Sequence, residues 1–202
     1  MKKFILAIGL ALGLHQAAMA GFAEGATAYN NKNYAAALKE IAPLARSGNP
    51  DCQHLLGLMY YMGRGVPQDY KQALEWHRKA ALQGKADAQY VVGAMYYTGN
   101  AVIQDHKQAV TWFRKAAEQG HPDAQQALGL MYRYHMAGMP QDNVIAYMLW
   151  NLAAANGSAN AAEQRASVVK GMTPEQIEEG QALSAAWKPN TPLPRQSRSG
   201  GG

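Results

Sequence analysis

The chain of 202 residues has a single cysteine, Cys52, and no long apolar run beyond its first residues. No disulfide can form within the chain, so its stability has to come from side-chain packing. The apolar run from Phe4 to Leu14 is too short to span a bilayer, and no later stretch approaches the roughly 20 apolar residues that a spanning helix needs. We therefore expect no stable membrane anchor.

The body of the chain also lacks an excess of positive charge, despite a formal net charge of +5. Five of the 19 basic residues lie near the ends, at positions 2, 3, 188, 195 and 198, whereas all 14 acidic residues lie between positions 21 and 187. The body is therefore electrically balanced. A surface that binds nucleic acid needs clustered positive charge, so we expect no nucleic-acid partner.

The first twenty residues have the pattern of a signal peptide. Lys2 and Lys3 precede the apolar run, and Ala18 and Ala20 supply the small side chains that a signal peptidase requires. We expect residues 1–20 to be removed after Ala20, which places the mature protein in the periplasm or outside the cell. Because Gly21 stands where a lipoprotein would carry its cysteine, lipid anchoring is not expected.

One motif occurs three times along the chain. LMYYMGRGVPQD at 58–69 returns as AMYYTGNAVIQD at 94–105 and, one residue longer, as LMYRYHMAGMPQD at 130–142. An ungapped alignment of 51–86 with 87–122 gives 20 identities in 36 positions. Self-similarity at this period is typical of solenoids, in which each repeat is one supersecondary unit.

Within each copy, two apolar patterns with helical spacing flank a glycine-containing loop. The pattern predicts two antiparallel helices, with Asp69, Asp105 and Asp142 as N-caps of the second helix. A glycine recurs inside the first helix, where it costs about 1 kcal/mol relative to alanine. We expect it to allow close helix approach, with the alanine pairs of the second helix as the complementary surface. The recurring glycines are Gly57, Gly93 and Gly129.

The pattern Y-x-x-G-x-G-V-x-x-D-x-x-K-A, followed by W and R-K-A-A-x-x-G, resembles the Sel1-like repeat, a relative of the tetratricopeptide repeat. The match is looser in the third copy, where Leu149 replaces the tryptophan and Trp150 reads as that tryptophan displaced by one position. The resemblance implies an all-α fold, a right-handed α-solenoid of antiparallel helical hairpins.

We expect the chain to begin with a signal peptide and to end with a disordered tail. Thr173, Pro174 and Gln176 open a terminal capping helix, and the proline- and glycine-rich end has the composition of a disordered segment. The segments are a signal peptide at 1–20, a tetratricopeptide-like hairpin at 21–50, Sel1-like repeats at 51–86, 87–122 and 123–159, a helix and the capping helix within 160–187, and a disordered tail at 188–202.

The resemblance also implies a binding surface, because the first helix of each hairpin lines the concave face of such stacks. The positions four after and three before the internal glycine should face this groove. Aromatic and arginine side chains there are typical of protein interfaces, although packing within the hairpins is an alternative use of the same rings. Tyr29 stands four after Gly25 of the first hairpin, and Tyr134 adds a ring one position beyond Arg133. The candidate partner-binding residues are Tyr29, His54, Tyr61, Tyr90, Tyr97, Gln126, Arg133 and Tyr134.

Catalytic and metal chemistry have weak support in the sequence. Ser167 and Lys170 fit the S-x-x-K motif of penicillin-binding enzymes, and some Sel1-like proteins have been described as β-lactamases, but no S-D-N or K-T-G motif follows. The six histidines lack the paired spacing of metal ligands. We therefore expect no catalytic residue, no metal and no cofactor.

These observations together favour an exported, non-enzymatic adaptor that binds a protein or peptide in its concave groove. Two alternatives stay open: a cell-wall activity of the β-lactamase type, and a secreted factor that binds a host protein. The sequence does not identify the partner.

Overall fold

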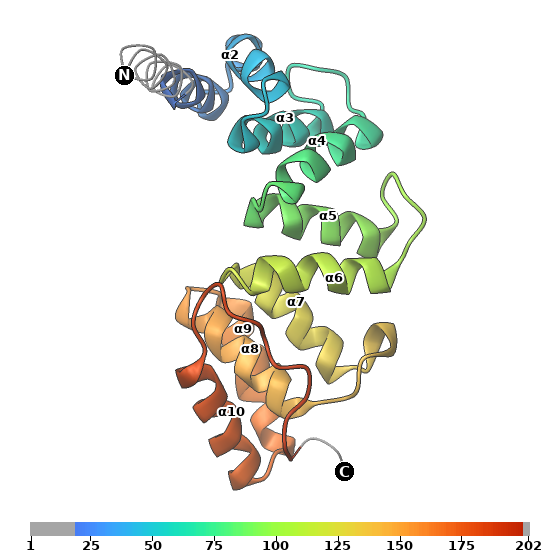
Figure 1. Ribbon diagram of the computed structural model, residues 1–202, viewed down its shortest axis with the longest axis vertical. Coiled ribbons are helices and arrows are strands. Elements are labelled where there is room, and N and C mark those ends of the chain that lie inside the picture. The colour runs from blue at the N-terminus through green and yellow to red at the C-terminus, as the bar shows by residue number, and fades with distance from the viewer. Residues whose placement is uncertain (1–18, 200–202) are drawn as a thin grey trace, which may run out of the picture. The chain divides into compact units, whose positions relative to one another are not determined.

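A computed structural model describes residues 19–199, in which all regular structure is helical (Figure 1). The chain divides after Lys85 into two compact units, which are described separately below. Most of the predicted signal peptide, residues 1–18, lies outside the described residues. None of the helices described has the length and apolar character needed to cross a membrane.

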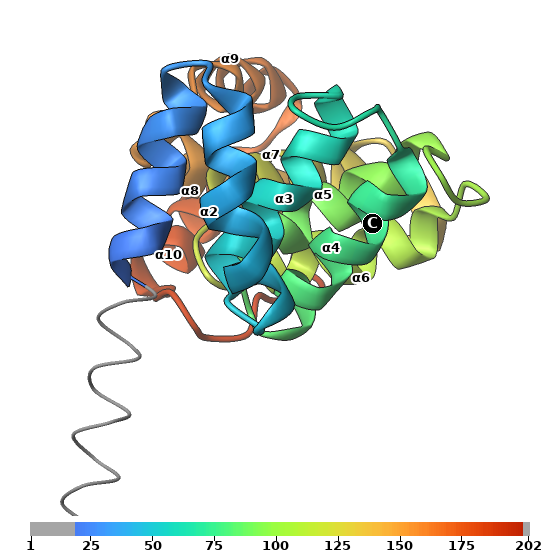
Figure 2. The same cartoon turned by 90° about the horizontal axis from the view of Figure 1, so that it is seen from above.

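The first unit contains two helical hairpins. Residues 19–30 are helical, and the chain turns at Lys32, whose φ is 60°, into the next helix. Figure 2 shows these two helices side by side. The remaining helices of the unit are α2 (Tyr34–Arg46), α3 (Pro50–Met62) and α4 (Tyr70–Leu82).

The core of the first unit joins α2 to α3. Ile41 and Met59 are fully buried in one apolar cluster, together with the thiol of Cys52. A Cβ on Gly25 would lie 2.6 Å from the side chain of Ile41, so the first hairpin also uses a helical glycine for close approach. Burial raises the pKa of the Cys52 thiol to about 11, and Asp51 adds to this shift.

The second unit continues the hairpin pattern and ends with a capping helix. Its helices pack in sequence from α5 to α8, and both α9 and α10 pack against α8. Its elements are α5 (Ala86–Thr98), α6 (His106–Ala117), α7 (Pro122–Arg133), the 3-10 turn η1 (Met136–Gly138), α8 (Asn143–Ala155), α9 (Ala159–Val168), the 3-10 turn η2 (Val169–Gly171) and α10 (Pro174–Ala186).

The predicted aspartate caps are confirmed in all three repeats. The carboxylates of Asp69, Asp105 and Asp142 each accept hydrogen bonds from two backbone N–H groups in the first turn of the second helix. These bonds satisfy donors that a helix N-terminus leaves unpaired. The motif therefore fixes where the second helix of every repeat begins.

The partner of the recurring glycine is an aromatic ring, not the predicted alanine pair. In each repeat, a Cβ added to the glycine would lie within 2.4 to 2.8 Å of a ring from the second helix. The alanine pairs are buried in the core as well, but the close approach at the glycine is made by the ring. The glycine–ring pairs are Gly57–His77, Gly93–Phe113 and Gly129–Trp150.

The same comparison corrects the interpretation of Trp150 in the third repeat. Trp150 occupies the ring position of Phe113 and is fully buried, with its indole N–H donating to the carbonyl of Gln126 at 3.2 Å. It is therefore not a displaced version of Trp112. The position of Trp112 is held by Leu149, which is buried in the same core cluster.

The capping helix has the predicted N-terminus. The hydroxyl of Thr173 accepts from the backbone N–H of Gln176, and the side chain of Gln176 accepts from the backbone N–H of Thr173. This helix, α10, is fastened to α8 by a hydrogen bond of 2.8 Å from Asn151 Nδ2 to Ser184 Oγ.

The tail was predicted to be disordered, and residues 188–199 are instead ordered against the second unit. The chain leaves α10 and crosses α6, α7 and the start of α8 as an extended segment (Figure 1). Leu193 and Ser197 are buried along this path. Composition failed as a guide because the groups that hold this segment come from distant parts of the chain.

Candidate protein-binding surface

One set of candidate residues, four after each helical glycine, packs at the loop end of its hairpin. The side chain four residues after the helical glycine contacts the first residue of the second helix in every hairpin. For the three tyrosines this contact is an edge-to-face pair of rings, with centroids 5.1 to 5.5 Å apart, and the arginine donates a hydrogen bond of 3.2 Å. The pairs are Tyr29–Tyr34, Tyr61–Tyr70, Tyr97–His106 and Arg133–Asn143.

In the first unit, Tyr29 is further engaged by a cation. Arg64 Nη1 donates to the hydroxyl of Tyr29 at 2.7 Å, and its guanidinium carbon lies 5.4 Å from the centre of that ring. Tyr61 keeps part of its ring exposed above Tyr70. Both tyrosines therefore serve packing in their own hairpin while leaving an edge open to solvent.

The second set of candidate residues lies three residues before each glycine. These residues contact the ring of the second helix that packs against the glycine. The ring of His54 lies 5.0 Å from that of His77, and Tyr90 lies 5.7 Å from Phe113. The carbonyl of Gln126 accepts from Trp150. All three side chains are half-buried, so packing accounts for much of their surface.

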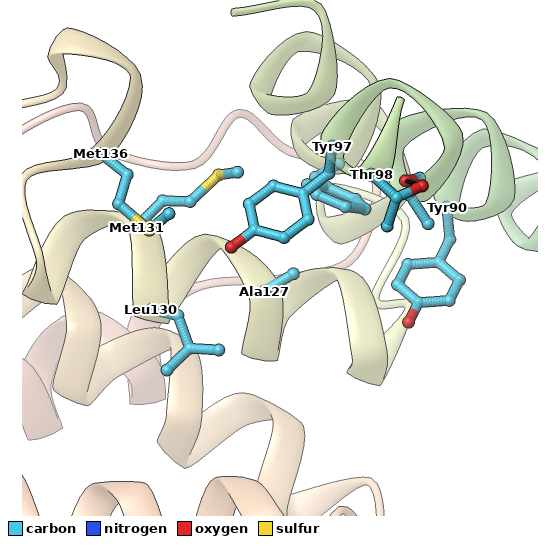
Figure 3. A pocket seen from close by; sticks show the side chains of 9 residues that line it. Tyr90, Tyr97, Thr98, Ala127, Leu130, Met131 and Met136 are labelled. Atoms are coloured by element: carbon cyan, nitrogen blue, oxygen red, sulfur yellow. Dashed lines mark hydrogen bonds between the residues drawn. The ribbon is translucent and has the colours of Figure 1, made fainter. Parts of the chain in front are cut away.

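Tyr90 and Tyr97 both line an open cleft of about 290 Å³ within the second unit (Figure 3). Residues of α5, α6, α7 and η1 form its walls, and Tyr97 extends from α5 toward α7, above Ala127 in the view of Figure 3. None of the side chains that line it carries a charge. The lining residues are Tyr90, Ala94, Tyr97, Thr98, Phe113, Ala127, Leu130, Met131 and Met136.

The end wall of the cleft comes from the longer loop of the third repeat. Helix α7 stops at Arg133, and His135, Ala137 and Gly138 adopt positive φ values before the chain enters α8. This path places Met136 at one end of the cleft, beside Met131 (Figure 3). The additional residue of the third copy thus changes the shape of this surface.

The other candidates in this unit do not line the cleft. The ring of Tyr134 is 62% exposed just beyond α7, with the guanidinium carbon of Arg133 5.8 Å from its centre. The Oε1 of Gln126 accepts from the hydroxyl of Ser158, the N-cap of α9. Of the predicted residues, therefore, only Tyr90 and Tyr97 are brought together in this cleft.

Several residues of the cleft were missed by sequence reasoning. Ala127 and Leu130 lie two before and one after Gly129, so they share the first-helix face that the candidate positions define. Extending that face by these offsets would have found them. Met136 gives no such signal, because its position depends on the left-handed loop.

Ionisable side chains lie at the rim of the cleft, next to Tyr90. His121 stacks on Tyr90 with ring centroids 4.9 Å apart, and its Nε2 lies 3.5 Å from the carboxylate of Asp87. Burial lowers the pKa of His121, an effect that Asp87 and Asp123 oppose. Burial raises the pKa of Tyr90, and Asp123 adds to it, so this phenol stays neutral and can donate a hydrogen bond.

The residues considered for catalysis and metal binding lie elsewhere. Ser167, in α9, and Lys170, in η2, are both exposed. Among residues 19–199, no group of three or more His, Cys, Asp or Glu side chains is placed to hold a metal ion.

Comparison with known proteins places the repeats precisely. The Sel1 repeat model matches residues 50–85, 86–121 and 122–158, which shifts the boundaries predicted from the sequence by one residue. No curated protein sequence matches the chain.

Two solved structures are similar over most of the chain. A Sel1 repeat protein from Oxalobacter formigenes is 35% identical with a TM-score of 0.68, over 71% of this chain and 58% of that one. The protein c5321, a protective antigen present in uropathogenic Escherichia coli strains, is 34% identical with a TM-score of 0.73, over 89% of this chain and 39% of that one.

The chain therefore spans less than two thirds of either relative. Three matched repeats, the capped hairpins and these two structures agree on one assignment: the chain belongs to the Sel1 repeat family.

Proposed function

We propose that the protein is an exported scaffold that holds a protein or peptide partner through the cleft of its second unit. The observation that carries the proposal is an uncharged cleft of about 290 Å³ whose walls include Tyr90 and Tyr97, two of the residues predicted to bind a partner. Membership of a repeat family that typically mediates protein interactions supports it.

The size and chemistry of the cleft favour one apolar anchor side chain of a partner. Sites for small molecules usually have volumes of about 300 to 1,000 Å³ and a few convergent polar groups, so this cleft is at the lower limit. Its polar groups are the phenols and Thr98, whose hydroxyl already donates to the carbonyl of Ala94 at 2.9 Å. A leucine, methionine or phenylalanine side chain fits such a lining, with a phenol hydroxyl free to bond the partner's backbone.

A peptide-display selection against the purified protein tests this proposal. We expect the selected peptides to share an apolar anchor and to lose binding at least tenfold to the Leu130→Glu variant, because the carboxylate would be buried against that anchor. Ile103→Glu is the matched control, since Ile103 is 92% exposed in a loop outside the cleft. Peptides that bind both variants equally well would contradict the proposal.

Export is the second part of the proposal and is supported by the leader pattern of residues 1–20. Mass spectrometry of the protein purified from its native cells should give Gly21 as the first residue, and fractionation should separate retention in the periplasm from secretion. An intact Met1 would exclude cleavage.

No observation favours the enzymatic alternative. A nucleophilic serine needs a base held beside it in a site that binds substrate, and Ser167 and Lys170 instead present exposed side chains at the end of α9.

A further inference from the structure

The ordered tail is held chiefly through its backbone, as a bound peptide would be. Arg114 Nη1 donates to the carbonyl of Leu193 at 3.1 Å, and a carboxylate oxygen of Glu118 accepts from the N–H of the same residue at 3.2 Å. Tyr132 Oη donates to the carbonyl of Arg195 at 3.1 Å and accepts from Arg114 Nη2 at 2.6 Å.

The same mode of contact continues to the end of the described chain. A carboxylate oxygen of Asp142 accepts from the N–H of Ser197 at 2.6 Å. Glu179 accepts from the N–H groups of Arg198 and Ser199 at 2.6 and 3.2 Å. We call the surface formed by Arg114, Glu118, Tyr132, Asp142 and Glu179 the tail channel.

The tail channel recognises little of the tail's side-chain sequence. Only Leu193 and Ser197 are buried, four residues apart, whereas Arg195, Gln196 and Arg198 are exposed. Main-chain hydrogen bonds with pockets for a few side chains are the usual way in which a protein binds an extended peptide. The contact is therefore open to other segments with the same spacing.

Charge adds a second criterion. The channel contains three carboxylates, those of Glu118, Asp142 and Glu179, against one guanidinium. The tail brings Lys188, Arg195 and Arg198 and no acidic residue. Next to Arg195 lies an open cleft of about 450 Å³, lined in part by Glu118 and Lys115, which leaves three carboxylates against two basic side chains on this surface. A basic segment is thus favoured over an acidic one.

We propose that the tail channel is a second peptide-binding site, for an extended basic segment with an apolar residue followed four positions later by a small one, and that the C-terminal tail is its intramolecular occupant. The channel shares no residue with the cleft of Figure 3, so the two are distinct sites of the second unit. The tail buries few apolar atoms relative to the backbone it has to order, and a partner segment can therefore displace it.

The first experiment loosens the tail in the full-length protein. Leu193→Asp places a charge where an apolar side chain is buried, and hydrogen exchange of the amides at 193–199 reports the release. The probe is a fluorescent synthetic peptide with the sequence KPNTPLPRQSRS, whose binding is followed by anisotropy. We expect the variant to bind it at least tenfold more tightly than the wild type, in which the tail competes.

Changes in the channel itself provide the control. Adding Arg114→Ala to Leu193→Asp should weaken peptide binding at least fivefold, whereas adding Arg78→Ala, at the equivalent exposed position of the first repeat, should leave it unchanged. If Leu193→Asp leaves the tail amides protected, Ser197→Pro is added, because it removes the N–H that Asp142 accepts.

Three results would overturn the proposal. One is fast exchange of the tail amides in the wild type, which would mean that the channel is not occupied. Another is a released tail with no peptide binding at millimolar concentration. The third is a wild-type dimer that the Leu193→Asp variant loses, which would assign the tail to the channel of a second copy.

Discussion

At the scale of single residues, the ring beside the helical glycine is the most informative position of each repeat. Phe113 and Trp150 fill it with apolar or hydrogen-bonded rings, but the first repeat uses His77. Neither ring nitrogen of His77 has a hydrogen-bond partner among the described residues, and the side chain is fully buried. Burial, with a smaller contribution from His54, lowers the pKa of His77 to about 3.

We predict that His77 makes the first unit sensitive to acid. In the unfolded chain His77 takes up a proton near its ordinary pKa of about 6.5, while the folded protein holds it neutral down to about pH 3. The free energy of unfolding is therefore unaffected by His77 above pH 6.5. It falls by roughly 1.4 kcal/mol per pH unit as the pH drops from there toward 3.

The His77→Phe variant tests this directly, because phenylalanine is the residue at the equivalent position of the second repeat, Phe113. Urea titrations at pH 7.5 and 4.5 should show a loss of stability at pH 4.5 that is smaller in the variant than in the wild type by about 2 to 3 kcal/mol. Equal losses in the two proteins would show that other groups cause the acid sensitivity.

Cys52 should be inert in the folded protein. Its side chain is fully buried and its pKa is raised to about 11, so almost no thiolate exists at neutral pH. We predict that a thiol-reactive dye labels Cys52 at least a hundredfold more slowly in buffer than in 6 M guanidinium chloride. Comparable rates would indicate that α3 opens readily.

At this scale the sequence predicts which positions require a small, buried side chain, but it does not predict which side chain packs against them. Cys52 aligns with Ala88 and Ala124, and this alignment is enough to predict a buried, small position. The glycines also signal close approach, but the pattern does not say which side chain approaches. That choice depends on the rotation of the second helix, which places His77, Phe113 and Trp150 opposite the glycines and the alanines beside them.

At the scale of elements, the three aspartate caps have the same local geometry but differ in the contacts they make beyond the helix. Asp105 is exposed and caps only α6. Asp142 is 2% exposed, and its second carboxylate oxygen also accepts from Ser197 in the tail. Loss of a cap costs about 1 kcal/mol, and loss of a hydrogen bond to a charged group costs about 1.5 to 3 kcal/mol.

We therefore predict that Asp142→Ala destabilises the second unit by about 2 to 4 kcal/mol, and Asp105→Ala by about 1 kcal/mol. Chemical denaturation measures both, followed by fluorescence in a background that keeps only Trp150. Hydrogen exchange should show release of the tail only in Asp142→Ala. If the two variants lose the same stability, the tail contact contributes nothing measurable.

The contrast between the helices and the tail shows where sequence reasoning ends. Helix starts were predictable because Asp69, Asp105 and Thr173 act on backbone groups within three residues. The tail was not, because its partners are far away in sequence: Arg114 and Leu193 are separated by 79 positions. Composition describes what a segment can bury by itself and says nothing of a channel built by other elements.

At the scale of the whole molecule, the candidate residues fall into two units. Tyr29, His54 and Tyr61 belong to the first, and the second holds the cleft with Tyr90 and Tyr97. The sequence predicted candidate residues at fixed offsets from each helical glycine, and the side chains four residues after the glycine make the same contact in every hairpin. The cleft forms where the third repeat differs from the other two, through its longer loop and Met136.

The tryptophans allow the two units to be followed separately in one protein. Trp76 is the only tryptophan of the first unit, and Trp112, Trp150 and Trp187 belong to the second. In repeat proteins each hairpin contacts mainly its neighbours, so cooperativity can break between units when one is destabilised. We expect acid to destabilise the first unit through His77; burial also lowers the pKa of His121 in the second unit, but Asp87 and Asp123 oppose that shift.

We predict that acid separates the two unfolding transitions. A variant that keeps only Trp76 should unfold at a lower urea concentration at pH 4.5 than a variant that keeps only Trp150, while the two midpoints lie closer together at pH 7.5. Adding His77→Phe to both variants should bring the midpoints at pH 4.5 together again, because it removes the group that cannot accept a proton in the folded state. Midpoints that coincide at both pH values would mean that the chain unfolds as one cooperative block, and the division after Lys85 would then have no energetic counterpart.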